Sequence, residues 1–294
     1  MITLAFYQWQ AQWAPECGGN LCSLAYNGFE LLRKPPNLDT LRQTPELYGI
    51  PVLFPPNRIE NGEFTFAGQR YRLPLNEPAR NNHLHGLALH VEWLISGPCE
   101  ARFYHRATKD YPAEFELRLK YEFQPEQVVQ VLTVINHGNE PMPCGIGFHT
   151  VFNAPVRLRL DAAECYREVL PPRYLPTGRL LPWEGFNPNH WFSPGEQALS
   201  RQFQATPGVH AAELDYGQLW LRYEVDPKFT EWCLWNGGKD SGFICPEPMS
   251  WMTNAPNLVD DISQLGGCQT QEFISLIIVG VQYKSKFSDK ARIL

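Results

Sequence analysis

Residues 114–123 read EFELRLKYEF, and the spacing of their side chains decides the fold class. Apolar residues fall on one side of an extended chain (Phe115, Leu117, Leu119, Tyr121 and Phe123), and charged residues fall on the other (Glu114, Glu116, Arg118, Lys120 and Glu122). This alternation predicts a half-buried antiparallel strand. Residues 127–136, QVVQVLTVIN, are β-branched and alternate less, which favours a strand nearer the centre of a sheet. Because Pro125 lies between the two stretches, we expect them to form a hairpin.

Further strands are predicted at residues 156–160, 218–225, 229–235 and 272–283. No stretch of a dozen residues keeps a convincing helical period with caps, so helix should be sparse. Proline (26 residues) and glycine (22) are plentiful and only 19% of the residues are charged, which also favours short strands joined by turns. We therefore expect an all-β protein in which residues 1–294 form a single large antiparallel β-sandwich, without a linker or repeat that would divide it.

Charge and cysteine usage limit the possible partners. The net charge of −6 and a pI near 5.8 give no general attraction for nucleic acid or anionic lipid. No apolar run is long enough to cross a membrane and the N-terminus lacks a leader pattern, so we expect a soluble cytoplasmic protein. Eight scattered cysteines form neither a disulfide framework nor a zinc pattern. Residues 170–194 contain six prolines and are expected to be a long surface loop, of the kind that often borders a binding site.

Two polar stretches in the first hundred residues are candidate binding segments. Asn57 and Arg58 follow two prolines and precede an Asn-Gly turn and an alternating strand pair. Arg58 offers a planar fork of donors, although a surface ion pair would also explain it. His83 and His85 in NNHLHG (residues 81–86) are expected on the same side of an extended chain. Ordinary turn histidines explain this pair better than a metal site, because no third ligand is evident, and we predict no metal.

Two later stretches carry titratable side chains in apolar surroundings. His149 interrupts GFHTVFNAP (residues 147–155), where it is either a core histidine or a functional one. Glu247 lies between two prolines after Phe243–Cys245, so its carboxylate is expected where a strand stops. A solvated turn glutamate is the simple interpretation, whereas apolar neighbours such as Trp251 would raise its basicity.

Together these segments resemble the aldose 1-epimerase (galactose mutarotase-like) family. The resemblance lies in Asn-Arg-Ile at 57–59, Gly-x-Phe at 62–64, Gly-x-x-Tyr-x-Leu at 68–73, Leu-His-Gly at 84–86, His-x-x-Phe-Asn at 149–153, Cys-x-Glu at 245–247 and Ala-x-Asn at 255–257. It spans residues from about 50 to 280 and implies a β-supersandwich with a cleft on one sheet. Galactose-type members usually carry Thr-Gln after the glutamate, where this sequence has Pro248. The sequence here looks closer to the branch that includes hexose-6-phosphate epimerases, so the identity of the sugar is left open.

The resemblance implies the interconversion of α and β anomers of a free hexose or hexose 6-phosphate, with no cofactor. Ring opening moves one proton from the anomeric hydroxyl and one to the ring oxygen, which a carboxylate and an imidazole on opposite sides would serve. We assign Glu247 as the base and protonated His149 as the acid. Arg58 and His85 would donate hydrogen bonds, and Asn57 would orient Arg58 or a hydroxyl.

Other roles stay open from the sequence. His83 is either a substrate contact or part of the scaffold. Trp235, Trp251 and Phe148 would present flat faces to the sugar unless they belong to the core. A non-catalytic sugar-binding or sensing protein is the main alternative, and a lyase or hydrolase with paired carboxylates is a second one. The partner is expected to be a monosaccharide or sugar phosphate, and the protein a monomer or homodimer.

Overall fold

The hairpin predicted from residues 114–136 lies inside the largest sheet. In the computed structural model, which describes residues 1–208 and 210–281, β12 (Phe115–Gln124) pairs antiparallel with β13 (Gln127–Asn136). Leu117, Leu119 and Tyr121 are buried, whereas Arg118 and Lys120 are exposed. The alternation in the sequence therefore predicted both the strand and its buried face, and the hairpin is confirmed.

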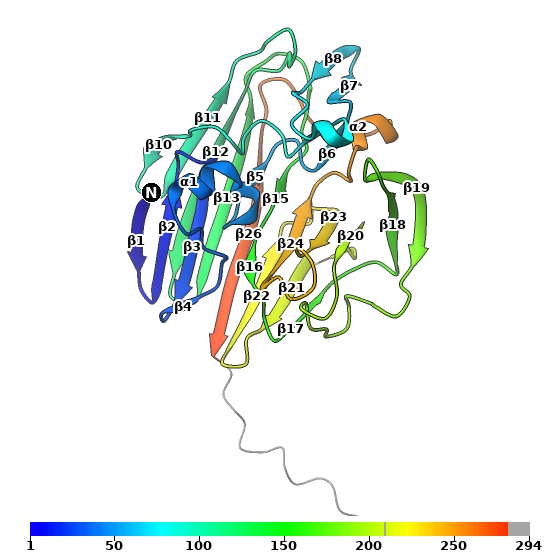
Figure 1. The fold of residues 1–294 in the computed structure, drawn as a ribbon. Helices are drawn as coiled ribbons and strands as arrows, with labels where there is room; N and C mark the ends of the chain where they lie inside the picture. Colours follow the sequence, from blue (N-terminus) through cyan, green and yellow to red (C-terminus); the bar gives the residue numbers. More distant parts are fainter. Residues whose placement is uncertain (209, 282–294) are drawn as a thin grey trace, which may run out of the picture.

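Two eight-stranded antiparallel sheets form the body of the molecule (Figure 1). The first sheet has the order β10 (Leu94–Gly97), β11 (Glu100–His105), β12, β13, β26 (Thr270–Val281), β22 (Leu219–Val225), β21 (His210–Asp215) and β17 (Arg157–Leu160). The second has the order β19 (Leu175–Pro182), β18 (Cys165–Leu170), β20 (Ser200–Gln204), β23 (Glu231–Trp235), β24 (Phe243–Met249), β15 (Gly147–Phe148) and β5 (Val52–Leu53), and β16 (Phe152–Asn153) also pairs with β24.

Smaller sheets extend this body. An N-terminal sheet contains β1 (Ile2–Phe6), β2 (Trp9–Ala14), β3 (Asn20–Tyr26) and β4 (Phe29–Glu30). It packs on β12, because Trp13 contacts Tyr121 with ring centroids 6.5 Å apart and the Trp9 indole donates to the Gln124 carbonyl. Three strand pairs complete the fold: β6 (Arg58–Glu60) with β9 (Asn82–Leu84), β7 (Glu63–Phe66) with β8 (Gln69–Arg72), and β14 (Met142–Pro143) with β25 (Gln264–Leu265).

Aromatic side chains fill the space between the two large sheets. Tyr223 of β22 contacts Phe152 of β16 and Trp232 of β23, and Phe273 of β26 contacts Phe229 next to β23. Burying such rings against each other is the main apolar contribution to packing two sheets face to face. The predicted all-β sandwich is confirmed.

Helix is sparse in the described part of the chain, as the sequence predicted. It comprises α1 (Leu38–Gln43), α2 (Ala255–Leu258) and two 3₁₀ turns, η1 (Pro45–Leu47) and η2 (Pro78–Arg80). None of the helices in the described ranges is long and apolar enough to span a membrane.

The other predicted strands match the structure, with one correction. Residues 156–160, 218–225 and 229–235 contain β17, β22 and β23, and β26 covers 272–281 of the strand predicted to residue 283; residues 282 and 283 lie outside the described part. The prediction that residues 170–194 contain no strand is wrong, because β19 (Leu175–Pro182) pairs with β18 at the edge of the second sheet. Proline is tolerated on an edge strand, where a missing N–H breaks no ladder.

The main hydrophobic cluster contains side chains from Leu4 to Val279 and so joins the two ends of the described chain. That residues 1–294 form a single domain stays a prediction, since it includes residues outside the described part.

Candidate active site

A pocket of about 450 Å³ opens over one face of β20, β23 and β24. Ser200, Cys233, Trp235 and Glu247 form its floor, since they are register neighbours on these strands. The walls come from elsewhere in the chain: Glu46 and Leu47 of η1, Asn57 and Arg58 at the start of β6, Glu77 and Arg80 around η2, Leu84 and His85 at the end of β9, His149, and Tyr174 between β18 and β19. A cavity of this size matches pockets that bind small molecules.

A gap in the second sheet places His149 against Glu247. Strand β15 pairs with β24 at Met249, and β16 pairs with β24 at Phe243 and Ile244. Residues 149–151 connect β15 to β16 without joining the ladder, so β24 has no strand partner between residues 245 and 248 on that side. His149 lies at this gap, and its Nε2 is 3.4 Å from Oε1 of Glu247.

The sequence-based view of Glu247 needs two corrections. Glu247 does not follow a strand but lies within β24, opposite Cys233 of β23. It is also not a solvated turn residue, since only 2% of it is exposed. Pro246 and Pro248 are compatible with the strand because successive residues of a strand direct their N–H groups to opposite sides. The two prolines lack an N–H on the side of the gap, so the hydrogen bonds between β24 and β23 are kept.

Burial controls the ionisation of the pair. Burial raises the pKa of Glu247 to about 8, against the opposing effects of the Arg58 charge and the Cys233 thiol. Burial lowers the pKa of His149 to about 4. Burial therefore favours the uncharged pair, with the proton on Glu247, whereas protonated His149 was expected from the sequence. The two groups are also neighbours rather than opposing flanks of the pocket, because no sugar ring fits in 3.4 Å.

His85 and Asn57 approach the pair from a strained corner of the backbone. Both have left-handed φ values, 67° and 57°, and the Asn57 carbonyl accepts the His85 N–H at 3.0 Å. The His85 ring packs against His149 with centroids 5.2 Å apart. Burial, together with the neighbouring His149 and Arg58 charges, lowers the pKa of His85 well below its usual range, so this imidazole is neutral. Backbone strain of this kind is frequent at functional sites.

Gly86 explains why the chain turns at this corner. Its φ is +79°, and a Cβ there would lie 2.0 Å from the Phe54 carbonyl oxygen. Only glycine allows the backbone to approach Phe54 this closely, and His85 is held beside the pocket as a result.

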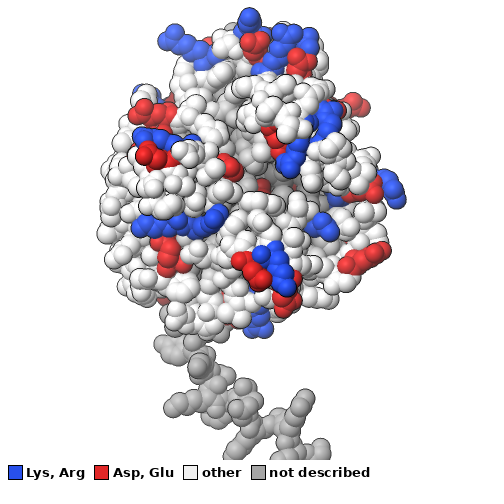
Figure 2. All heavy atoms as spheres, in the orientation of Figure 1, with Lys and Arg blue, Asp and Glu red and all other residues white. Residues whose placement is uncertain are grey.

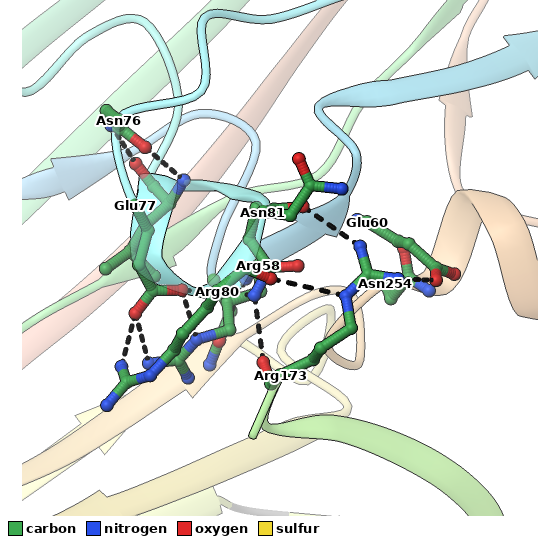
Figure 3. A network of polar contacts seen from close by, with 11 residues as sticks. Arg58, Glu60, Asn76, Glu77, Arg80, Asn81, Arg173 and Asn254 are labelled. Carbon is green, nitrogen blue, oxygen red and sulfur yellow. Dashed lines mark hydrogen bonds and ion pairs between the residues drawn. The ribbon is translucent and has the colours of Figure 1, made fainter. Parts of the chain in front are cut away.

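Arg58 is held by Glu77 rather than exposed in a surface ion pair (Figure 3). Its Nε and Nη2 donate to the Glu77 carboxylate at 2.8 and 3.0 Å, and Asn57 Oδ1 accepts the Arg58 N–H at 2.9 Å. Arg80 donates to the same carboxylate. Burial raises the pKa of Glu77, but hydrogen bonds from Arg58 and Asn82 outweigh this effect and leave it below the usual range. Among the described residues, the bidentate contact uses Nε and Nη2 and leaves Nη1 of Arg58 for a ligand.

Three of the aromatic or imidazole candidates lie outside the pocket. His83, predicted as a possible substrate contact, is buried, and its Nδ1 lies 2.6 Å from the Pro74 carbonyl oxygen, so the structure supports the scaffold alternative. Phe148 packs on Phe229 in the core. Trp251 packs with Ala255 and Ile262 and does not line the pocket. Trp235 does line it, and its ring contacts His149 at 5.8 Å between centroids.

Several pocket residues were not singled out from the sequence: Glu46, Leu47, Glu77, Arg80, Leu84, Tyr174, Ser200 and Cys233. A signal existed for Cys233, which alternates with Trp235 in the predicted strand 229–235. For Tyr174 the signal was the proline-rich stretch 170–194, which was expected to border a binding site, but nothing in it pointed to this residue in particular. Around the hollow seen in Figure 2, acidic and basic side chains are interspersed rather than gathered by sign.

Comparison with known proteins decides the family. A family model described as aldose 1-epimerase matches residues 12–267, most of the chain. The chain belongs to the aldose 1-epimerase family. The resemblance noted in the sequence is thereby confirmed, and it extends further towards the N-terminus than the quoted segments.

The aldose 1-epimerase fold is shared with solved structures over nearly the whole chain. A galactose mutarotase-like protein from Clostridium acetobutylicum superposes with a TM-score of 0.85 at 24% identity, covering 95% of both chains. The galactose 1-epimerase from Lactobacillus acidophilus gives 0.78 at 16% identity, covering 96% of this chain and 94% of that one. At these identities the likeness shows the fold alone. The uncharacterized protein YihR from Escherichia coli is 29% identical over 140 residues, 45% of this chain and 44% of that protein.

Proposed function

We propose that the protein is an aldose 1-epimerase, or mutarotase, which interconverts the α and β anomers of a free hexose or hexose 6-phosphate. One observation carries the proposal: His149 and Glu247, from separate parts of the sequence, meet at 3.4 Å in the floor and wall of a pocket. Their pKa values are shifted in opposite directions, to about 4 and about 8. Pairs of titratable groups with such divergent environments mark acid/base chemistry.

The close spacing of the pair suits the reacting atoms. The anomeric hydroxyl and the ring oxygen are bonded to the same carbon, so two neighbouring groups contact both oxygens from one side. Ring opening then transfers the hydroxyl proton to Glu247 and a proton from His149 to the ring oxygen, while the C–O bond breaks and the aldehyde forms. Rotation about the adjacent C–C bond and the reverse transfers give the other anomer.

The protonation state of the free site fits this cycle. After ring opening, Glu247 is protonated and His149 is neutral, which is the state that burial favours. To begin the opening step, the proton has to pass from Glu247 to His149, which lie 3.4 Å apart. The positive charge of Arg58 assists because it stabilises the Glu247 carboxylate.

The remaining residues would hold the sugar. Nη1 of Arg58 and the ring of His85 would donate hydrogen bonds to sugar oxygens. The side-chain oxygen of Asn57 accepts the backbone N–H of Arg58 and keeps that backbone in place. The Trp235 ring would pack on the C–H face of the sugar. The contacts of Arg58 and His85 support roles in steadying the negative charge that develops as the ring opens.

Anomer exchange measured by NMR tests the function. The wild-type protein is added to equilibrated glucose, galactose and their 6-phosphates, and the exchange rate is compared with that in buffer alone. We expect acceleration for at least one sugar. Saturable binding without acceleration would favour the non-catalytic binding protein instead.

We also propose that the protein acts in the cytoplasm, as a monomer or homodimer. All eight cysteines are free thiols, which suits a reducing compartment.

A further inference from the structure

The outer wall of the pocket contains a corner that the reaction above does not use. Residues 171–174 connect β18 to β19, and the Tyr174 N–H donates to the Leu170 carbonyl at 2.8 Å. Tyr174 has a left-handed φ of 55° and lines the pocket. The corner belongs to the edge of the second sheet, whereas the residues it faces come from β6, η2 and β9.

Arg173 ties this corner to the opposite wall (Figure 3). Its guanidinium donates to the Arg80 carbonyl at 3.2 Å, the Asn61 side chain at 2.8 Å and the Asn81 carbonyl at 3.0 Å, and it forms an ion pair with Glu60. The Arg173 carbonyl in turn accepts from the Asn82 amide at 2.8 Å. So many directed contacts from one side chain fix its position and that of its neighbours.

Tyr174 is held next to two arginines of the pocket. The guanidinium carbons of Arg80 and Arg58 lie over its ring, 4.3 and 5.6 Å from the centroid. The ring face is therefore occupied by cations, a favourable arrangement for an aromatic side chain. The hydroxyl of Tyr174 forms no hydrogen bond within residues 1–208 and 210–281, and the residue is 36% exposed. Its hydroxyl edge is available to a ligand.

We propose that Tyr174 is a specificity-determining residue that hydrogen-bonds a substituent of the sugar remote from the reacting C–O bonds, and that Arg173 is a positioning residue that acts through Tyr174. This inference rests on the proposed function of the pocket. The ring of Tyr174 contacts Arg58 and Arg80, and within residues 1–208 and 210–281 it makes no contact with His149 or Glu247, so a contact to its hydroxyl is separate from the acid/base pair. A contact made equally in the ground state and the transition state changes KM and leaves kcat nearly constant.

The test measures KM and kcat for glucose, galactose and their 6-phosphates with four variants. Tyr174→Phe keeps the ring and removes only the hydroxyl, and we expect its KM to rise about three- to ten-fold for at least one sugar, with kcat changed less than about three-fold. Arg173→Gln should raise the KM of the same sugar. The double variant should be no worse than Arg173→Gln, because a displaced Tyr174 no longer contacts the sugar. Arg179→Gln, in the same hairpin and paired with Glu168 at the surface, is the matched control and should behave as wild type.

Two results would overturn the inference: an unchanged KM for Tyr174→Phe with all four sugars, or effects of the two substitutions that multiply in the double variant. Isothermal titration of the same sugars with the same variants distinguishes a failure of the inference about Tyr174 from a failure of the proposed function. If the wild type binds a sugar without accelerating its anomer exchange, the function fails, and the inference is then decided by the dissociation constants. A wild type that neither binds nor accelerates any of the four sugars contradicts both.

Discussion

At the scale of single residues, burial does more than hold His149 and Glu247 in place. It removes the charge from both, so that the pair carries one proton over a wide range of pH. A pair in this state can give and take a proton in the same step. The residue types were readable from the sequence, but their protonation was not, because it depends on burial in the folded protein and, for Glu247, on the charge of Arg58, which acts on it only after folding.

The rate should therefore depend on pH as a broad plateau. Below about pH 4 both His149 and Glu247 carry a proton, so the pair has no base. Above about pH 8 neither carries one, so the pair has no acid. We expect kcat/KM to fall on both sides of that range. Polarimetry in buffers from pH 4 to 9.5, with the buffer rate subtracted, measures the profile. A rate that rises steadily through pH 9 would contradict this prediction, because it would show that the reaction does not need the proton shared by the pair.

The buried carboxyl should also lower stability at high pH. Between its ordinary pKa of 4.5 and about 8, Glu247 keeps its proton in the folded protein and loses it in the unfolded chain. Folding then takes up a proton, so the free energy of unfolding decreases as pH rises through this range. Glu247→Gln removes this dependence.

The melting temperature of Glu247→Gln relative to wild type should therefore be higher at pH 8.5 than at pH 5, by about 1.5 °C for each kcal/mol recovered. Glu122→Gln, at an exposed position of β12, serves as the control. An equal difference between variant and wild type at both pH values would show that Glu247 is not protonated by burial.

At the scale of elements, alternation in the sequence predicted β12 and β-branched residues predicted β13, and each strand has one deeply buried face. The same rule missed β19 and ended the strand before Glu247, since prolines in both stretches suggested breaks. Proline lacks the backbone N–H, and this loss weakens a sheet only where that N–H would have faced a neighbouring strand. The edge of the sheet accommodates β19, and the gap between β15 and β16 accommodates Pro246 and Pro248. Sheet neighbours of this kind are set by tertiary structure.

The corner that holds His85 should depend on Gly86. Gly86→Ala would place a Cβ 2.0 Å from the Phe54 carbonyl oxygen, so the backbone has to move and His85 with it. We expect a lower melting temperature and weaker activity. Gly68→Ala is the matched control, because its φ of +76° is similar but a Cβ there meets nothing within 4 Å. The control should lose only about 1 kcal/mol from the left-handed backbone. Equal melting temperatures for the two variants would argue against the close approach.

At the scale of the whole molecule, the fold collects one pocket from segments spread between residues 46 and 247. The second large sheet provides the floor through β20, β23 and β24, and the smaller strand pair β6 and β9 carries Arg58 and His85 to its rim. The sequence indicated Asn57, Arg58, His85, His149 and Glu247 through motifs that resemble the aldose 1-epimerase family, and Trp235 as an aromatic candidate, and all of these line the pocket. It indicated the stretch that contains Tyr174 but not the residue, and it did not indicate Glu77, because both enter the pocket only through the packing of β18, β19 and η2.

The account is tested most directly by the rate of anomer exchange in three proteins: wild type, His149→Ala and Glu247→Gln, with His190→Ala at an exposed position as the control. The sugar is freshly dissolved α-glucose or its 6-phosphate, followed by polarimetry, and circular dichroism confirms that each variant is folded. Each substitution in the pair should slow the catalysed rate by at least about a hundred-fold, because each removes an acid or base. A wild-type rate in either variant would contradict the acid/base role of that residue.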